Sequence, residues 1–305
     1  MRKHDTVLRF CLAAAVALIA GAGSSPAADD KIGVQSVNYP LHYFAGRLAS
    51  EAFDVQYLVP GNVDPAFWKP DDDAVVAFQE ADVILRNGAD YAKWMKSVTL
   101  PATIMVDTSK AFSEELIDEE GHQHKHGDGD VHSHGGTAFT TWLDFSQAVE
   151  QARAVAEKFK QLSPGEAEAI DGKFASLKKD LEFLDVEMEK FGDKWGDKPL
   201  TASHPIYQYF ARAYGLKIEA LEWEPGMEFT AEAKRDLQKL LGEHPAKWMI
   251  WEDEPTDELI EGLAELGVKS VVVDPCANRP DAGDWLLVMK QNLKNLQAMF
   301  EAVPE

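Results

Sequence analysis

Cysteine is scarce in this chain, and basic residues are outnumbered. There are two cysteines among 305 residues, Cys11 and Cys276, so a disulfide scaffold beyond the N-terminal segment is excluded. Acidic residues outnumber basic residues by 52 to 30, which gives a formal net charge of −22. Because phosphate contacts need lysine and arginine, this balance excludes nucleic acid as a partner and disfavours anionic lipid. The charge is compatible with a cationic ligand but does not identify one.

Long apolar runs are also missing, except at the N-terminus. Basic residues there precede an apolar stretch over residues 10–22, and small residues follow over 23–27. The stretch is shorter than the roughly 20 residues that span a bilayer. A basic segment, a short apolar run and a small-residue cleavage site together make up a secretory signal. We therefore expect residues 1–27 to be removed on export, and the remaining chain to work in the periplasm.

Beyond this segment, short β-branched runs alternate with amphipathic stretches. Strand and helix alternating at this spacing predict an α/β fold of two lobes, each a parallel sheet with flanking helices. The predicted strands cover residues 31–37, 55–59, 83–86 and 103–106 in the first lobe, and 200–203, 218–221, 248–251 and 270–273 in the second. The predicted helices cover residues 41–51 and 71–81 in the first lobe, and 206–214, 231–241, 256–266 and 284–301 in the second.

One long helical stretch separates the two predicted lobes. Apolar residues recur there at the three- and four-residue spacing of one helix face, at Leu177, Leu181, Leu184 and Met188. Pro164 is well suited to the first turn of this helix. We predict a single rigid connecting helix over residues 164–192. It would join an N-terminal lobe of residues 28–163 to a C-terminal lobe of residues 193–305.

A histidine-rich segment interrupts the first lobe over residues 121–136. It has almost no apolar side chain, so it cannot bury a core, and we predict a mobile loop. Because neutral imidazole binds transition metals, we expect weak, pH-dependent metal binding by this loop. Its histidines are His122, His124, His126, His132 and His134.

Several motifs, in order along nearly the whole chain, resemble those of one family. They read YPLHYFAGRLA, YLVPGNVDPAFWKP and ADVILRNGADYAKWM in the first half, and TASHPIYQYFARAYGL, EDEPT, GVKSVVVDP and DWLLVMKQNLKNL in the second. With these motifs the chain is similar to the zinc- and manganese-specific solute-binding proteins of bacterial ABC transporters. The resemblance implies two α/β lobes joined by one rigid helix, with a metal ion held in the cleft between the lobes.

The resemblance also implies which positions hold the metal. Zinc takes about four ligands in a tetrahedron, and this family supplies mostly histidines with one or two carboxylates. His204 falls on the third ligand position and Asp274 on the fourth, both after predicted strands, where α/β sheets place ligands. The N-terminal lobe departs from the pattern, because Ala66 and Thr140 stand where the family has histidine.

Three interpretations of this departure remain open. The loop histidines complete the site with His204 and Asp274, or a different ligand occupies an aromatic cleft near Phe67, or the cleft is degenerate. Glu254 follows a predicted strand and is a candidate acceptor for the second N–H group of a metal-bound histidine. Thr140 is a second candidate for such a supporting role.

The sequence therefore predicts a periplasmic carrier that delivers a divalent ion to an ABC permease dimer in the inner membrane. Zinc is the expected cargo, manganese is the alternative cargo, and we expect a monomer. The main alternative function is a metal chaperone or buffer, or a scaffold with a degenerate site. A zinc-dependent hydrolase is less favoured, because the sequence has no HExxH or GxSxG motif. We therefore expect no enzymatic activity.

Overall fold

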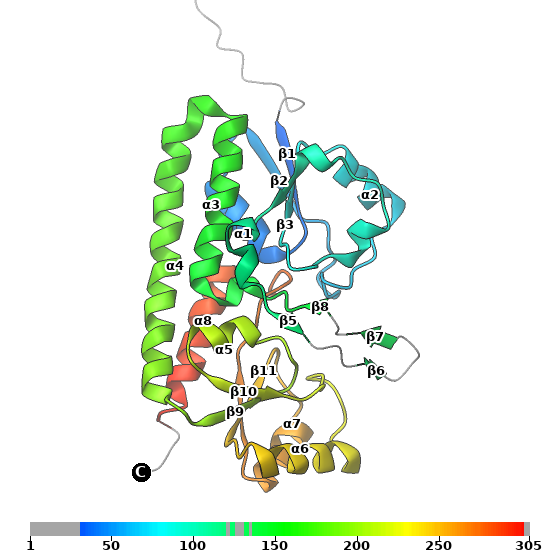
Figure 1. Ribbon diagram of the computed structural model, residues 1–305, viewed down its shortest axis with the longest axis vertical. Coiled ribbons are helices and arrows are strands. Elements are labelled where there is room, and N and C mark those ends of the chain that lie inside the picture. The colour runs from blue at the N-terminus through cyan, green and yellow to red at the C-terminus, as the bar shows by residue number, and fades with distance from the viewer. Residues whose placement is uncertain (1–30, 120–122, 126–130, 134–135, 302–305) are drawn as a thin grey trace, which may run out of the picture. The chain divides into compact units, whose positions relative to one another are not determined.

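The computed structural model contains two four-stranded parallel sheets, which confirms the predicted fold class (Figure 1). The predicted signal segment, residues 1–27, lies outside the described part of the chain. The described residues are 31–119, 123–125, 131–133 and 136–301.

The first sheet has the order β2-β1-β3-β4, and all its neighbouring strands are parallel. Its central strands β1 and β3 carry buried apolar side chains, which pack against helices on the sheet faces. The four strands are β1 (Ile32–Ser36), β2 (Phe53–Gln56), β3 (Val83–Arg86) and β4 (Met105–Asp107).

The second sheet repeats this arrangement in the order β10-β9-β11-β12, again with parallel neighbours. Every residue of β11 is buried, as expected for a central strand that is covered on both faces. The four strands are β9 (Pro199–Ala202), β10 (Lys217–Ala220), β11 (Trp248–Trp251) and β12 (Lys269–Val272).

Polar side chains cap most of the helices that flank the sheets. The caps accept hydrogen bonds from backbone N–H groups of the first turn, which have no partner within the helix. Asn38 and Asp71 cap α1 (Tyr39–Leu48) and α2 (Asp72–Gln79) in this way. Thr230, Thr256 and Asp284 cap α6 (Ala231–Glu243), α7 (Asp257–Glu265) and α8 (Trp285–Ala298). The short helix α5 (Gln208–Ala213) has no side-chain cap.

A long helix joins the half that contains the first sheet to the half that contains the second sheet, as predicted. These parts are called the first half and the second half below. α3 (Phe145–Leu162) runs into a 3-10 turn, η6 (Pro164–Glu166), and then into α4 (Ala167–Trp195). α4 has 29 residues and ends three residues beyond the predicted boundary at 192. It packs against α1 and α3 of the first half and against α8 of the second half (Figure 1).

The histidine-rich segment contains more regular structure than a loop. Two short strands, β6 (Gln123–Lys125) and β7 (Val131–Ser133), pair in antiparallel fashion with His124 opposite His132. A second antiparallel pair, β5 (Asp118–Glu119) and β8 (Gly136–Thr137), forms its base. Residues 120–122, 126–130 and 134–135 lie outside the described residues. The remaining 3-10 turns are η2 (Lys93–Lys96), η3 (Ala102–Ile104), η4 (Lys110–Glu115) and η5 (Thr141–Leu143).

Hydrogen bonds cross directly between the two halves. The Trp142 indole nitrogen donates to the carbonyl of Pro275 at 2.8 Å, and the Tyr209 hydroxyl donates to the carbonyl of Ala138 at 2.9 Å. The Asn278 side-chain amide donates to the carbonyls of Pro60 and Val63, both at 2.7 Å. These bonds and a continuous apolar core place both sheets in one compact unit.

Among the described residues, no helix combines the length and the apolar character that crossing a bilayer requires.

Candidate metal site

The candidate site lies at the carboxyl ends of the strands of the second sheet. β10 and β11 lie on opposite sides of β9, so the winding of the sheet reverses between β9 and β11. Such a reversal opens a crevice at the carboxyl edge of a parallel sheet, where α/β proteins bind ligands. His204 lies two residues beyond β9, and Glu252 lies one residue beyond β11. Asp274 lies two residues beyond β12.

Backbone hydrogen bonds bring a third segment to the same edge. Ser203 N–H donates to the Ile250 carbonyl at 2.8 Å, and Trp223 N–H donates to the Ser203 carbonyl at 2.7 Å. Trp223 is buried against Trp251, with ring centroids 6.3 Å apart. Because Trp223 is anchored in the core, the next side chain along the chain, Glu224, is held at the crevice.

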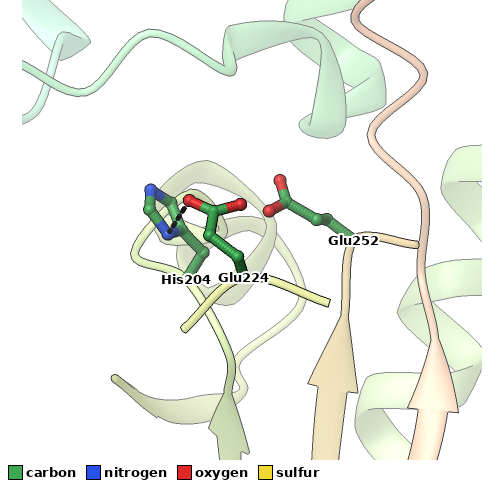
Figure 2. A group of neighbouring side chains, drawn as sticks. All are labelled: His204, Glu224 and Glu252. Carbon is green, nitrogen blue, oxygen red and sulfur yellow. Dashed lines mark ion pairs between the residues drawn. The ribbon is translucent and has the colours of Figure 1, made fainter. Parts of the chain in front are cut away.

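His204, Glu224 and Glu252 form a group that is suited to a metal ion. Each offers one ligand atom, and these three atoms lie within 4.8 Å of one another. His204 Nδ1 and Glu224 Oε1 are 3.9 Å apart. Figure 2 shows the carboxyl groups of Glu224 and Glu252 side by side, with the His204 ring beyond Glu224. His204 and Glu252 are partly buried, whereas Glu224 is exposed at the opening.

Burial and neighbouring carboxyl groups raise the pKa values of two acidic side chains at the site. Burial, and then the charges of Glu224 and Asp64, raise the pKa of Glu252 to about 8. Burial and the charge of Asp253 raise the pKa of Asp274 to about 6, although the N–H group of Cys276 donates to its carboxylate. A dication in the crevice would offset this repulsion and favour the ionised carboxylates.

These side chains line a cavity of about 1010 Å³. The opposite wall comes from the first half and carries Asp64, Pro65, Phe67, Phe139 and Thr140. Burial raises the pKa of Asp64, and a hydrogen bond from Ala66 N–H to its Oδ1 at 2.8 Å opposes that shift. The two walls therefore differ in chemistry. The wall from the second half carries a histidine and several carboxyl groups, whereas the wall from the first half carries aromatic and small side chains with a single carboxyl group.

Only some of the residues predicted from the sequence lie at the candidate site. His204 belongs to the group that could hold a metal ion, and Asp274 lines the same cavity outside that group. Thr140 also lines the cavity, and its hydroxyl donates to the Ile206 carbonyl. Ala66 is buried in the core and does not line the cavity. Glu254 is exposed and outside the lining, so Glu252 and not Glu254 is the glutamate beside His204.

Sequence reasoning missed Glu224 and passed over Glu252. A signal existed for Glu252, because the first residue after a central parallel strand lies at the ligand-binding edge of the sheet. Glu224 gave no such signal, since it lies in an irregular stretch that is placed by the burial of Trp223.

The loop histidines are not placed relative to the site. His124 and His132 lie in the paired strands β6 and β7, but their side chains are outside the described part of the structure. His122, His126 and His134 lie outside the described residues altogether. Their role in metal binding stays a prediction.

The profile of one protein family, the periplasmic component A of the zinc-uptake complex (ZnuA), matches residues 34–299. The chain belongs to the ZnuA family. Members of this family are substrate-binding proteins of transport systems, and its profile begins within β1 and extends over the rest of both sheets and α4.

Relatives in the ZnuA family include zinc and manganese proteins. The chain is 26% identical over 299 residues to the high-affinity zinc uptake system protein ZnuA of Bacillus subtilis, covering 94% of this chain and 93% of that protein. It is 25% identical over 283 residues to the zinc-binding lipoprotein AdcA of Streptococcus pneumoniae, covering 88% of this chain and 56% of AdcA. It is 24% identical over 315 residues to the manganese ABC transporter substrate-binding lipoprotein PsaA of S. pneumoniae, covering 97% of this chain and 98% of PsaA.

Solved structures show the same fold. The metal-dependent lipoprotein YcdH of B. subtilis superimposes with a TM-score of 0.74 at 22% identity, covering 88% of this chain and 99% of YcdH. Zn(II)-bound AdcA of S. pneumoniae also gives a TM-score of 0.74, at 20% identity, covering 88% of this chain and 57% of AdcA.

Proposed function

We propose that this protein captures a divalent metal ion in the cleft between its two halves and delivers it to an ABC permease. Zinc is the preferred cargo and manganese the alternative, because the relatives include a zinc uptake protein and a manganese transporter lipoprotein. The protein acts in the periplasm as a monomer, after removal of residues 1–27. Membership of the ZnuA family supports transport rather than catalysis.

The observation that carries the proposal is the convergence of His204, Glu224 and Glu252 within 4.8 Å. One imidazole nitrogen and two carboxylate oxygens are ligands that both zinc and manganese accept. Asp274 joins the ligand set in this proposal, because it lines the same cavity and its charge acts on Glu252.

Capture begins at the exposed side of the group. Glu224 lies at the opening and meets the incoming ion first, while His204 and Glu252 lie deeper. Binding draws the proton from Glu252, because a carboxylate coordinates a cation only when it is ionised. Release then requires these contacts to loosen with little movement of the sheets, since α4 and the cross-bonds hold both halves.

Calorimetric titration of the purified protein with zinc tests the site. We expect one tight site in the protein besides the weak binding by the loop, a loss of the tight site in His204→Ala and Glu252→Gln, and retention of it in Glu261→Gln. Glu261 is an exposed residue of α7 outside the cavity lining. Glu254→Gln separates the two neighbouring glutamates, and retained binding is expected. If His204→Ala and Glu252→Gln bind zinc like the unaltered protein, the cleft is not the site.

A variant that lacks residues 121–136 tests the loop interpretation. If its zinc site disappears while His204→Ala keeps binding, the loop is the main binding element and the cleft proposal is wrong. If the cleft site survives the deletion, the loop has at most an accessory role.

Delivery needs a cellular test. Cells without this gene should grow slowly under zinc chelation, and growth should return with the unaltered gene or Glu261→Gln but not with Glu252→Gln. Equal growth with and without the gene under chelation would favour a metal buffer over a transport component.

A further inference from the structure

One side of strand β12 has no neighbouring strand in the second sheet. β12 lies at the end of the strand order, and β11 is its only partner among the described residues. Just beyond β12, Val273 N–H donates to the carbonyl of Trp251 in β11 at 2.8 Å. Alternate residues of an extended strand present their backbone groups to opposite sides. The backbone groups of Val272 and Asp274 therefore face away from β11, and they need partners outside the sheet.

Two asparagines of α8 supply these partners. Asn295 Nδ2 donates to the Val272 carbonyl at 3.0 Å. Asn292, which lies one turn earlier in α8, bonds to both backbone groups of Asp274. Its Oδ1 accepts from Asp274 N–H at 3.0 Å, and its Nδ2 donates to the Asp274 carbonyl at 2.7 Å. Because Asn292 is buried, this side-chain amide holds the backbone of Asp274 at two points, as a neighbouring strand would.

The carboxylate of Asp274 is held by the turn that follows. Its Oδ1 accepts from Cys276 N–H at 2.6 Å, a short-range bond that fixes the side chain against its own backbone. Its Oδ2 accepts no hydrogen bond within the described part of the chain. Asp274 also lines the cavity of the candidate site. One oxygen of this carboxylate is therefore engaged, and the other is available to an ion.

The residues on either side of Asp274 are held as well. The Tyr207 hydroxyl donates to the Val273 carbonyl, and the Trp142 indole nitrogen donates to the Pro275 carbonyl, each at 2.8 Å. Tyr207 and Trp142 are both buried, and Trp142 belongs to the first half. The position of Asp274 is therefore set by the protein before an ion arrives.

This fixed position matters because Asp274 lies outside the group of His204, Glu224 and Glu252. A shift of its backbone would carry the carboxylate out of reach of an ion that is bound by that group. Residues that support a metal ligand typically change metal affinity by about 10- to 100-fold when they are altered.

We propose that Asn292 is a positioning residue of the metal site, which holds the backbone of Asp274 so that its carboxylate binds the ion through Oδ2 alone. This inference rests on the proposed function, in which Asp274 joins the ligand set. Binding through one oxygen suits zinc, which takes about four ligands. Binding through both oxygens of a carboxylate is common at ions with six to eight oxygen ligands, such as calcium.

A double-mutant cycle, measured by calorimetric titration with zinc, tests the role of Asn292. Asn292→Ala should weaken the tight site by about tenfold or more, because Asp274 loses its support. Asp274→Ala keeps the backbone groups that bond to Asn292 but has no carboxylate, and it should weaken the site at least as much. In the Asp274→Ala background, Asn292→Ala should then change zinc affinity by less than about twofold. A purely structural role would lower the affinity by the same factor in both backgrounds.

Asn295→Ala is the matched control for this cycle. Asn295 lies on the same helix and bonds to the same strand, but its bond goes to Val272 and not to Asp274. Asn295→Ala should lower stability in urea unfolding and leave zinc affinity within about twofold of the unaltered protein. If Asn292→Ala does not fold, Asn292→Ser, which keeps a polar group at the position, takes its place in the same cycle.

The absorption spectrum of the protein loaded with cobalt(II) needs no substitution at all. Cobalt(II) in place of zinc gives intense visible bands in a four-coordinate site and weak bands in a six-coordinate site. We expect intense bands in the unaltered protein and in Asn295→Ala, and a changed spectrum in Asn292→Ala. Weak bands in the unaltered protein would overturn binding of Asp274 through a single oxygen.

The outcomes separate this inference from the proposed function. Unchanged zinc affinity in Asn292→Ala, or in Asp274→Ala, would refute the inference and leave a cleft site of His204, Glu224 and Glu252 intact. Loss of affinity by the same factor with and without the Asp274 carboxylate would also refute it. Absence of zinc binding by the unaltered protein would refute both the inference and the proposed function.

Discussion

The two sheets have the same strand order, but different kinds of side chain follow the carboxyl ends of their strands. In the second sheet, the residues two positions after β9 and one position after β11 are His204 and Glu252. In the first sheet, the corresponding positions after β1 and β3 hold Asn38 and Asn87. One edge therefore carries ionisable side chains that could bind a metal ion, and the other carries neutral amides.

The side-chain amides of Asn38 and Asn87 form hydrogen bonds within the protein core. Asn87 Oδ1 accepts from the side chains of Asn38 at 3.2 Å and Gln151 at 3.1 Å, and its Nδ2 donates to the Phe139 carbonyl at 2.8 Å. Asn38 and Asn87 are fully buried. The same backbone topology therefore places both edges, while the side chains decide whether an edge is suited to bind a ligand or closes the core.

The largest expected effect is a loss of zinc affinity when a side chain at the edge of the second sheet is changed. Glu252→Gln should weaken zinc binding by more than about 100-fold, because it removes a carboxylate from the ligand group. It should leave the zinc-free protein at least as stable, since a neutral amide relieves the repulsion around a buried carboxyl. Calorimetry and urea unfolding measure the two effects. Strong destabilisation with intact zinc affinity would show that Glu252 has a structural role like that of Asn87.

The reverse result is expected for the first sheet. Asn87→Ala leaves several buried polar groups without their partner, and should lower the free energy of unfolding by about 2 kcal/mol. Zinc affinity should stay within about twofold of the unaltered protein when measured well below the unfolding temperature. A variant that loses zinc affinity without losing stability would contradict the division between the edges.

The charged edge should also respond to pH. Glu252 has a pKa of about 8 in the folded protein against 4.5 for a free glutamate. The zinc-free folded state therefore binds more protons than the unfolded state between these values, and its stability falls as pH rises through this range. Zinc affinity rises over the same range, by about tenfold per pH unit for one released proton.

Calorimetry in buffers of different ionisation enthalpy, from pH 5 to pH 8, measures the number of protons released. Glu252→Gln is the control, and its residual binding should depend less on pH. Zinc binding that releases no proton at pH 7 would contradict the raised pKa of Glu252.

The smallest effect concerns the bonds between the halves. The Tyr209 hydroxyl accepts from Ile117 N–H at 3.1 Å and donates to the Ala138 carbonyl. Tyr209→Phe removes both bonds and should lower the free energy of unfolding by about 1–2 kcal/mol. Urea unfolding measures this loss, and Tyr57→Phe at a different buried tyrosine is a matched comparison. A larger change in zinc affinity than in stability would show that this bond belongs to the binding site.

Much of the fold was predictable because the periodicity of the sequence is regular. The predicted strands at 83–86 and 248–251 coincide with β3 and β11, and the long helix follows from its leucine spacing. The small strands β6 and β7 were not predicted, since three-residue strands without apolar residues on alternate positions leave no periodic signal.

The site was predicted only in part, for physical reasons that concern register and burial. His204 was found through the resemblance and its place after a strand. The choice between Glu252 and Glu254 depended on where β11 ends, and strand ends are uncertain by a few residues in sequence. Glu224 comes to the group through the burial of Trp223, a tertiary effect that no local pattern encodes.

α4 has a further consequence for how this protein can be recognised. A single helix of 29 residues contacts elements of both halves, and the rings of Phe191 and Trp195 near its end pack against Phe300 in tilted arrangements. We therefore expect a receptor that contacts both halves to meet a similar spacing with and without cargo. Under the proposed function, such a receptor would detect loading through the loops at the rim of the cleft, where Asn278 links the two halves, rather than through a change in the angle between them.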